Sequence, residues 1–329
     1  MRIAVLGLGA VGKGVLRVLA EKPELGLVLT GVADSASGWI DPDGIDPGEV
    51  LDRKCTTNRC GTAGLTADDI LDAGEFDVLV EVTPTNASTG EPALTYIRRA
   101  LISGHHVVTS NKGPIAIAHA ELEDLAREQG VALRYEATVG GAIPVIHAIR
   151  SGLLGNRAHA ITGVLNGTCN YILTRMDEEG LTYDQALAEA RELGYAEADP
   201  TYDVRGIDAA IKLVILANTC WNLGVTLNDV SITGIDCLTV DALRLAADQD
   251  CTIRLIAEAS PERGQIRVAP RVLPRTHPLV IEGTLNAVTL SMDLAGEVTL
   301  MGRGAGSRET ASAIVGDLLA IRDRFIECG

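Results

Sequence analysis

The stretch that decides the fold is the N-terminus, "MRIAVLGLGAVGKGV" (residues 1–15). Its first residues are apolar, as in a buried strand, and a helical pattern follows the glycines. In a Gly-x-Gly-x-x-Gly turn the first glycine permits a sharp bend, the second lets the main chain approach a pyrophosphate, and the third lets the helix pack closely on the strand. A glycine turn can serve packing alone, but this one joins a predicted strand to a predicted helix, which favours dinucleotide binding. The candidate cofactor-binding residues of this turn are Gly7, Gly9, Ala10, Val11 and Gly12.

A second predicted strand, "LVLTGVAD" (27–34), ends in an acid at Asp34. An acidic residue about 20 positions after the glycine turn is placed to bind the ribose 2′-hydroxyl of NAD. No arginine adjoins Asp34, although Arg53 and Lys54 in the following segment could reach a 2′-phosphate. The sequence therefore favours NAD and leaves NADP open.

Strand and helix patterns continue to alternate after a Gly/Asp/Pro-rich segment that is expected to be a loop up to about residue 64. Strands are predicted at 76–83, 105–110 and 131–139, and helices at 91–104 and 118–130. Short strands that alternate with amphipathic helices imply right-handed crossovers and a parallel, doubly wound sheet. The predicted fold class is α/β, with an N-terminal Rossmann-type dinucleotide-binding domain.

The pattern changes from about residue 140. Two helices are predicted at 182–194 and 206–224, and strands at 251–259, 265–273, 286–292 and 297–302. This order is typical of an α+β unit with an antiparallel or mixed sheet. A last helix, 309–325, is expected to pack back on the first domain. The expected domains are therefore residues 1–135, completed by 305–329, and residues 136–304.

Composition excludes several classes of partner. The 329 residues carry 28 basic and 44 acidic side chains, a net charge of −16, which argues against nucleic acid and anionic membranes. No apolar run approaches the roughly 20 residues that a membrane span needs, and the N-terminus is better interpreted as a strand than as a signal peptide. The seven cysteines are scattered, and Cys55 and Cys60 lack the further ligands of a zinc site. A cytoplasmic location is expected.

Two lysines stand out because only five of the 28 basic residues are lysine. Lys112 follows a predicted strand at the sheet edge where α/β proteins bind ligands. Lys212 lies in an apolar helix four residues after Asp208. The ordinary alternatives are a surface lysine and an i,i+4 salt bridge. A lysine can release a proton at accessible pH and an arginine cannot, so both positions suit proton transfer or carbonyl polarisation.

The order of several motifs resembles homoserine dehydrogenase over nearly the whole chain. The motifs are "GLGAVGKGV", "TSNKGPIA", "YEATVGGAIPVI", "GVLNGTCNYIL", "ELGYAEADPTYDVRGIDAAIK" and "GRGAGSRETASAIVGDL". The resemblance implies reversible reduction of L-aspartate 4-semialdehyde to L-homoserine with NADH or NADPH, in threonine, methionine and isoleucine biosynthesis. It also implies a small-molecule substrate, a homodimer, and a second domain that serves catalysis and dimerisation.

The resemblance assigns a role to each matching residue. Lys212 is expected to be the proton donor, and Lys112 to contact substrate and cofactor. The other expected contacts are Glu197, Asp203 and Asp208 to the substrate, Thr83 beside the nicotinamide, and Gly302 and Gly304 near the cofactor. The physical chemistry agrees, because carboxylates bind a substrate ammonium and an ammonium protonates the alkoxide that hydride transfer creates.

The resemblance also implies a monovalent cation site, for Na⁺ or K⁺, beside "EATVGGAI". Its expected ligands are Glu136 and the main chain of Val139, Gly141 and Ile143. Closely spaced carbonyl oxygens suit a hard cation. The alternative is a glycine-rich turn that holds no ion.

The chain departs from the family pattern at Cys169, where the family usually has Ser or Thr. A small packing residue is expected there, and the alternative is a thiol for acyl-enzyme chemistry. No regulatory ACT module or fused aspartate kinase is recognised, so threonine feedback through such a module is not expected. The rival functions are another Rossmann amino-acid oxidoreductase and a nucleotide-sensing protein without catalysis.

Overall fold

The computed structural model describes residues 1–327, which form two compact units. Unit 1 comprises Met1–Ala142 and the residues from Gly306 onward, and unit 2 comprises Ile143–Ala305. The domain boundaries expected from the sequence were 135/136 and 304/305. Within the described part of the chain, every helix is too short or too polar to span a bilayer.

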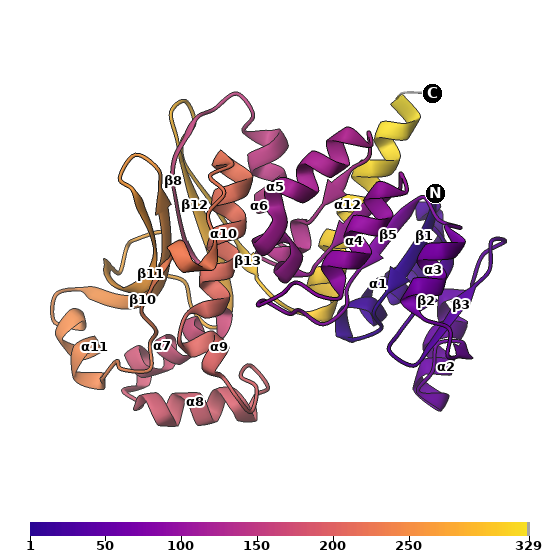
Figure 1. Cartoon of the computed structure of the whole chain (residues 1–329). Coiled ribbons are helices and arrows are strands. Elements are labelled where there is room, and N and C mark those ends of the chain that lie inside the picture. The colour runs from indigo at the N-terminus through magenta and orange to yellow at the C-terminus, as the bar shows by residue number, and fades with distance from the viewer. Residues whose placement is uncertain (328–329) are drawn as a thin grey trace. The chain divides into compact units, whose positions relative to one another are not determined.

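Unit 1 is built on a seven-stranded sheet in the order β4-β3-β2-β1-β5-β6-β7 (Figure 1). The strands are β1 (Arg2–Leu6), β2 (Val28–Ala33), β3 (Ser37–Ile40), β4 (Thr62–Ala63), β5 (Val78–Glu81), β6 (His106–Thr109) and β7 (Leu133–Arg134). The five strands from β2 through β1 to β7 pair in parallel, whereas β3 and β4 pair antiparallel at one edge. The order reverses at β1, so the carboxyl ends of β1 and β5 flank the point where ligands bind in such sheets.

The segment expected to be a loop up to residue 64 is structured, and that prediction was wrong. It contains β3, helix α2 (Pro47–Thr57) and β4. The side chain of Asp46 caps α2 by accepting from the main-chain N–H of Gly48, and Asn58 ends the helix at a φ of 58°. Asp-Pro at the start and Asn at the end are helix signals. They were missed in the prediction because Gly, Asp and Pro, which favour turns, are frequent in the segment.

Helices cover the sheet of unit 1. They are α1 (Ala10–Glu21), the 3₁₀-helix η1 (Pro23–Leu25), α2, α3 (Ala67–Ala73), α4 (Ala93–Ile102), α5 (Lys112–Glu128), the 3₁₀-helix η2 (Glu136–Thr138) and α12 (Ser307–Glu327). The C-terminal α12 packs beside α1, and its Ile314 and Leu318 share a core with Leu16 of α1 and Val5 of β1. The two ends of the sequence therefore complete one hydrophobic core (Figure 1).

Unit 2 is built on a six-stranded sheet in the order β13-β12-β8-β10-β11-β9. Its strands are β8 (Ala158–Val164), β9 (Ser231–Ile232), β10 (Cys251–Ser260), β11 (Gln265–Pro274), β12 (Leu285–Met292) and β13 (Gly296–Arg303). All pairs are antiparallel except β11 with β9. The central strand β8 was not predicted from the sequence, because the His, Thr and Gly residues of β8 weaken the alternation of apolar and polar positions.

The helical elements of unit 2 are α6 (Val145–His147), the π-helix η3 (Ala148–Gly152), α7 (Gly167–Glu179), α8 (Tyr183–Glu192), α9 (Thr201–Val204), α10 (Ile207–Trp221), the 3₁₀-helix η4 (Leu227–Asp229) and α11 (Val240–Ala247). Helix α10 is buried along residues 208–218 and contacts β8, β10 and β11 (Figure 1). Asp208 and Lys212 are the charged residues of this buried stretch. Charged groups at such positions need partners, which the site geometry supplies.

Candidate active site

The glycine turn of unit 1 has the geometry that its sequence pattern predicts. Gly7 follows β1 with a φ of +101°, and a Cβ there would lie 2.5 Å from the carbonyl oxygen of Val82. A Cβ on Gly12 would lie 2.0 Å from the carbonyl oxygen of Gly7. A Cβ on Gly9, in contrast, would meet no atom within 4 Å. The close main-chain packing of the turn therefore requires glycine at positions 7 and 12, whereas the space beside Gly9 is unfilled by protein atoms.

The N-terminus of α1 faces this open space. Gly9 is its N-cap and supplies no side-chain acceptor, and the first turn has no acidic residue. The first N–H groups of a helix lack intrahelical partners and carry partial positive charge. A pyrophosphate fits such a site because it brings the missing acceptors and the opposite charge.

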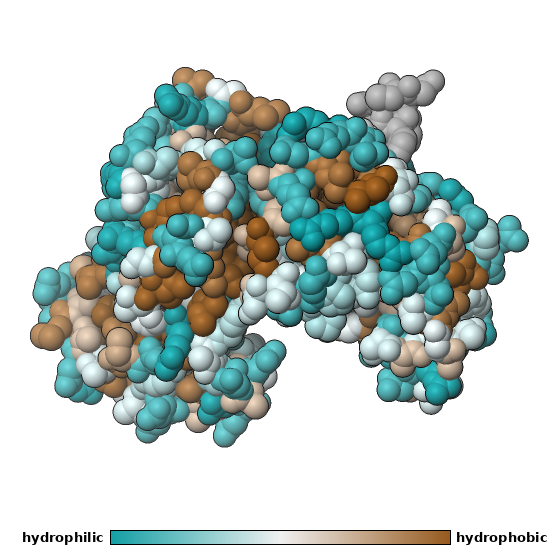
Figure 2. Space-filling model, viewed as in Figure 1, coloured by the Kyte–Doolittle hydropathy of each residue, from teal (hydrophilic) through white to brown (hydrophobic). Residues whose placement is uncertain are grey.

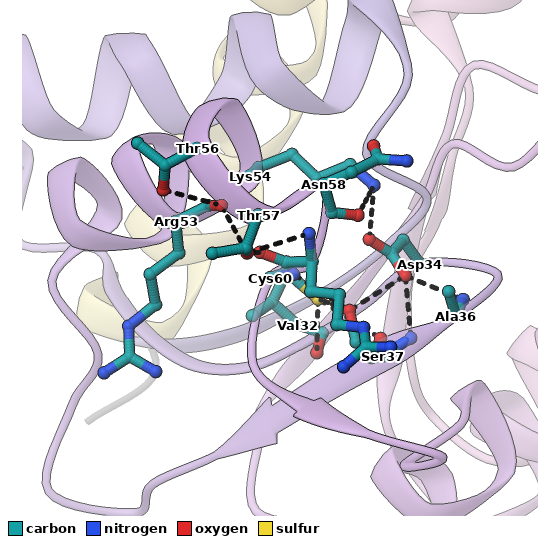
Figure 3. Close-up of polar contacts among 11 residues, drawn as sticks. Val32, Asp34, Ala36, Ser37, Arg53, Lys54, Thr56, Thr57, Asn58 and Cys60 are labelled. Atoms are coloured by element: carbon teal, nitrogen blue, oxygen red, sulfur yellow. Dashed lines mark hydrogen bonds and ion pairs between the residues drawn. The ribbon is translucent and has the colours of Figure 1, made fainter.

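Asp34 follows β2 and is paired with Lys54 of α2 (Figure 3). The Lys54 ammonium lies 2.7 Å from Asp34 Oδ2 and donates to the carbonyl of Asn58 over 2.8 Å. Asp34 Oδ1 accepts from the main-chain N–H groups of Ala36 and Ser37, each over 2.8 Å. Burial opposes ionisation of Asp34, but the hydrogen bonds from Lys54 and the main chain outweigh it and lower its pKa. Asp34 is therefore an ionised acceptor held by one counter-ion.

Arg53 is held away from this pair. Its guanidinium bonds Glu49, with Nε 3.0 Å from Oε1, and it stacks over the ring of Trp39 at 4.4 Å. Figure 3 shows the Arg53 side chain extending away from Asp34. Arg53 and Lys54 were both considered from the sequence as possible contacts for a 2′-phosphate, and of the two only Lys54 is bonded to Asp34.

Glu81 is hydrogen-bonded to residues at the ends of β5 and β6, and it is not among the residues predicted from the sequence. Its side chain is 0% exposed and accepts from the N–H of Thr83 over 2.8 Å, from the Thr83 hydroxyl, and from the Thr109 hydroxyl over 3.0 Å. Burial raises its pKa, although these hydrogen bonds oppose the shift. The amide of Asn111 donates to the carbonyl of Thr83 over 3.2 Å and links the same two segments.

Lys112 is the first residue of α5, three positions after β6 ends. Asn111 caps this helix by accepting from the N–H of Gly113 over 3.2 Å. Lys112 was expected in a loop before a helix that began at 118, whereas α5 begins at Lys112 itself. Its main chain is consequently fixed by the helix and by the Glu81 network.

Unit 2 holds a buried cluster of acids around Lys212. Lys212 Nζ lies 2.8 Å from Asp208 Oδ2 and donates to the carbonyl of Leu165 over 2.7 Å. The amide Nδ2 of Asn166 donates to Asp208 Oδ2 over 2.9 Å and to Asp203 Oδ1 over 2.7 Å. Asp208 and Lys212 are 5% and 8% exposed. The i,i+4 pair that the sequence suggested is present, within a larger network.

Glu197 lies on an exposed turn between α8 and α9. The turn is fastened at Tyr195, whose carbonyl accepts from the Thr168 hydroxyl over 2.8 Å and whose ring lies 4.9 Å from that of Tyr171. Asp199 accepts from the N–H of Thr201 and has the ordinary role of a turn residue. The structure thus brings together Asp203, Asp208 and Lys212 and leaves Glu197 at the surface.

Comparison with known proteins identifies the family of the chain. The family model for homoserine dehydrogenase matches residues 144–319, and the model for the homoserine dehydrogenase NAD-binding domain matches residues 7–136. The chain is 42% identical to homoserine dehydrogenase of Methanocaldococcus jannaschii, over 98% of both chains. It is 39% identical to the NAD(+)-dependent homoserine dehydrogenase of Pseudomonas canavaninivorans, over 97% of this chain and 96% of that one. The structure of a hyperthermophilic archaeal homoserine dehydrogenase in complex with NADPH superposes with a TM-score of 0.84, at 32% identity over 98% of both chains.

The chain belongs to the homoserine dehydrogenase family. The family predicted from the motifs is confirmed, as is the α/β fold class with a second α+β domain. Membership makes the chain an oxidoreductase that uses NAD or NADP.

The expected cation ligands do not all belong to one unit. Glu136, Val139 and Gly141 belong to unit 1, and Ile143 begins unit 2. Glu136 is buried in η2, and its N–H donates to Asp317 Oδ2 over 2.9 Å. Among residues 1–327, no three His, Cys, Asp or Glu side chains gather as a metal site would require. A site of main-chain carbonyls stays a prediction.

Gly302 and Gly304 have packing roles within unit 2. A Cβ on Gly304 would lie 2.2 Å from the side chain of Asn286, and one on Gly302 would lie 3.2 Å from Ile143 Cγ1. Asn286 in turn donates to the carbonyl of Leu165 over 2.9 Å. Gly304 therefore makes room for a side chain that contacts the lysine cluster, and its expected approach to the cofactor stays a prediction.

Cys169 is a buried packing residue in this family member. Its Sγ donates to the carbonyl of Asp203 over 3.1 Å. Burial, together with Asp203 and Asp208, raises the pKa of the thiol well above its ordinary value. A thiol that stays protonated is a poor nucleophile, which disfavours acyl-enzyme chemistry.

Proposed function

We propose that this chain catalyses the reversible, NAD(P)-dependent interconversion of L-aspartate 4-semialdehyde and L-homoserine. The observation that carries the proposal is the buried network of Lys212 with Asp208, Asp203 and the carbonyl of Leu165. Carboxylates bind an ammonium through charge-assisted hydrogen bonds, so Asp203 and Asp208 suit the ammonium of an amino-acid substrate. Pathway placement in threonine, methionine and isoleucine biosynthesis follows from the family.

Lys212 is suited to proton donation. Its Nζ gives hydrogens to Asp208 and to the carbonyl of Leu165, and an ammonium has a third hydrogen to offer. The Asp208 carboxylate lies against Lys212 Nζ, and both side chains are buried, so the pair acts in a site with little water around it. Bound NADH or NADPH supplies the hydride that converts the aldehyde to an alkoxide. Lys212 stabilises the alkoxide and gives it the proton.

The other sequence-derived roles are proposed on the same basis. Asp203 and Asp208 receive the substrate ammonium, and Glu197 adds a carboxylate from its exposed turn. Lys112 contacts substrate and cofactor, and Thr83, held by Glu81, lies beside the nicotinamide. Gly302 and Gly304 approach the cofactor, and a monovalent cation binds at Glu136, Val139, Gly141 and Ile143.

We further propose a preference for NAD over NADP. The Asp34 carboxylate is ionised and preformed as an acceptor for ribose hydroxyls, whereas a 2′-phosphate would meet its negative charge. Lys54 is engaged by Asp34 and the carbonyl of Asn58, and it would have to leave both to bind a phosphate. The preference is measured as the ratio of kcat/KM for the two cofactors.

A homodimer formed through unit 2, in the cytoplasm, completes the proposal. Unit 2 exposes the large hydrophobic residues Leu154, Val272, Leu294 and Met301. Figure 2 shows brown, hydrophobic residues gathered over unit 2 on the visible face. Exposed apolar patches are typical of association surfaces. Light scattering after gel filtration measures the assembly state.

The proposed cytoplasmic location is supported by the cysteines. All described cysteines are free thiols, which suits a reducing compartment.

The test of the activity is reduction of NAD or NADP, followed by absorbance, with purified protein and L-homoserine. Aspartate and malate serve as competing substrates, because they represent the other amino-acid and hydroxy-acid oxidoreductases of this fold. Homoserine-dependent reduction supports the proposal. Reduction with aspartate or malate but not homoserine, or with none of the three, contradicts it.

A further inference from the structure

Asn166 stands where three elements of unit 2 meet. It follows β8 by two residues and is the N-cap of α7. Its side-chain oxygen accepts from the main-chain N–H of Cys169 over 2.8 Å, and the residue is 5% exposed. This cap bond fixes which way the amide faces, because the oxygen is committed to the helix. The NH₂ group must then point away from the helix N-terminus.

The NH₂ group of Asn166 bridges two carboxyl groups from different helices. It donates to Asp203 Oδ1 on α9 over 2.7 Å and to Asp208 Oδ2 on α10 over 2.9 Å. Two carboxylates that share one donor nitrogen lie close together, and like charges at short range repel each other. The positive end of the amide dipole offsets part of that repulsion and sets the spacing of the two acids.

Leu165, the residue before Asn166, contacts the lysine of the Asp208–Lys212 pair. The carbonyl of Leu165 accepts from Lys212 over 2.7 Å and from the amide of Asn286 over 2.9 Å. Leu165 and Asn166 are consecutive, so one short segment contacts both members of the Asp208–Lys212 pair, Lys212 through the Leu165 carbonyl and Asp208 through the Asn166 side chain. Displacement of this segment would disturb the acid and the lysine together.

We propose that Asn166 is a positioning residue for substrate recognition: it holds Asp203 and Asp208 at the spacing that receives the ammonium of homoserine, and it keeps Lys212 aligned through Leu165. The proposal rests on the proposed function and assigns a determinant of its substrate site. Asn166 itself need not touch the substrate, since its hydrogens are used by the two acids.

Replacement of Asn166 by serine separates this role from helix capping. Serine is as good an N-cap as asparagine, but it has no NH₂ group to bridge two carboxylates. We expect Asn166→Ser to raise the KM for homoserine at least tenfold and to lower kcat less than tenfold. The KM for NAD should stay within twofold of wild type, because the glycine turn and Asp34 lie in unit 1.

A second variant, Asn166→Asp, keeps the cap oxygen and replaces the bridging donor by a third acid. We expect it to lower kcat/KM for homoserine at least a hundredfold, more than Asn166→Ser. The matched control is Thr239→Ala, which removes the side-chain cap of α11 in the same unit without touching an acid. It should lower the unfolding temperature slightly and leave both KM values unchanged.

The experiment measures kcat and KM for homoserine and NAD, and the unfolding temperature, for wild type and the three variants. A rise in homoserine KM confined to the Asn166 variants supports the proposal. A homoserine KM within twofold of wild type in Asn166→Ser overturns it, and so does loss of folded protein in both Asn166 variants, which would assign Asn166 a structural role alone. If wild type itself does not oxidise homoserine, the proposed function fails first, and that result is read before any variant.

Discussion

Glu81 is a completely buried carboxyl group, and we expect Glu81→Gln to change how stability depends on pH. Burial raises the pKa of Glu81 above its ordinary value, although donors from Thr83 and Thr109 oppose the shift. The folded protein therefore keeps the Glu81 proton at pH values where the unfolded chain has lost it.

The sign follows from this difference in proton binding. Below the unfolded pKa, about 4.3, both states are protonated and the contribution of Glu81 is fully present. As pH rises toward the folded pKa, only the folded state retains the proton, so wild-type stability falls by about 1.4 kcal/mol per pH unit. Above the folded pKa the loss is complete and the curve is flat.

Glutamine preserves the local geometry without a titrating group. Its oxygen can accept from the N–H and hydroxyl of Thr83, as Glu81 does. Its NH₂ group can donate to the Thr109 hydroxyl, which still donates to the main-chain carbonyl of residue 81 over 2.9 Å. We therefore expect Glu81→Gln to match wild type near pH 4 and to exceed it at pH 8 by at least ~1 kcal/mol, the scale of one net hydrogen bond.

The assay is urea unfolding followed by circular dichroism between pH 4 and 8, with wild type and variant in the same buffers. The quantity of interest is the difference in unfolding free energy, because other titrating groups cancel in it. Glu24→Gln is the matched control, since it makes the same charge change at an exposed site of unit 1. A difference that is constant with pH, or that favours wild type increasingly as pH rises, would refute the reasoning, because it would mean that folding does not raise the pKa of Glu81.

Three further substitutions test the site. Lys212→Ala should lower turnover by roughly 10²–10⁴-fold, the range for loss of a general acid, with the KM for NAD unchanged; near-normal turnover in the absorbance assay would reduce Lys212 to a salt-bridge partner. Lys54→Met should raise the KM for NADP about tenfold or more and the KM for NAD less than about threefold, because Asp34 without its counter-ion repels a 2′-phosphate. Equal changes in the two KM values would disprove a role of Lys54 in discriminating NAD from NADP. Gly12→Ala should abolish NAD binding in a fluorescence titration, since the new Cβ would lie 2.0 Å from the Gly7 carbonyl oxygen, and retained affinity would show that the turn can widen.

Much of unit 1 could be predicted because its signals are local. The strand–Gly7-x-Gly9-x-x-Gly12–helix pattern specifies a turn whose shape depends on neighbouring residues, and the structure has that turn. Helix α2 was missed because Asp, Gly and Pro dominate the composition around it, although Asp46 and Asn58 cap it correctly. Strand β8 was missed because a central strand is stabilised by its neighbours on both sides and not by its own alternation.

The sequence by itself determined the family and the fold class, and it predicted the candidate reactive side chains, among them Lys212, Asp208 and Asp203. Motif order and short-range spacing are enough for these, because turns, caps and i,i+4 pairs join residues that are near in the chain. Only the tertiary structure decided which groups surround them. Asn166 meets Asp208, which is 42 positions further along the chain, and Lys54 meets Asp34, which is 20 positions before it. The acceptor of the Lys212 hydrogen bond is the main-chain carbonyl of Leu165, which no side-chain pattern can predict. These contacts arise because packed strands and helices bring distant segments together, and a buried charge is stable only where such partners meet it.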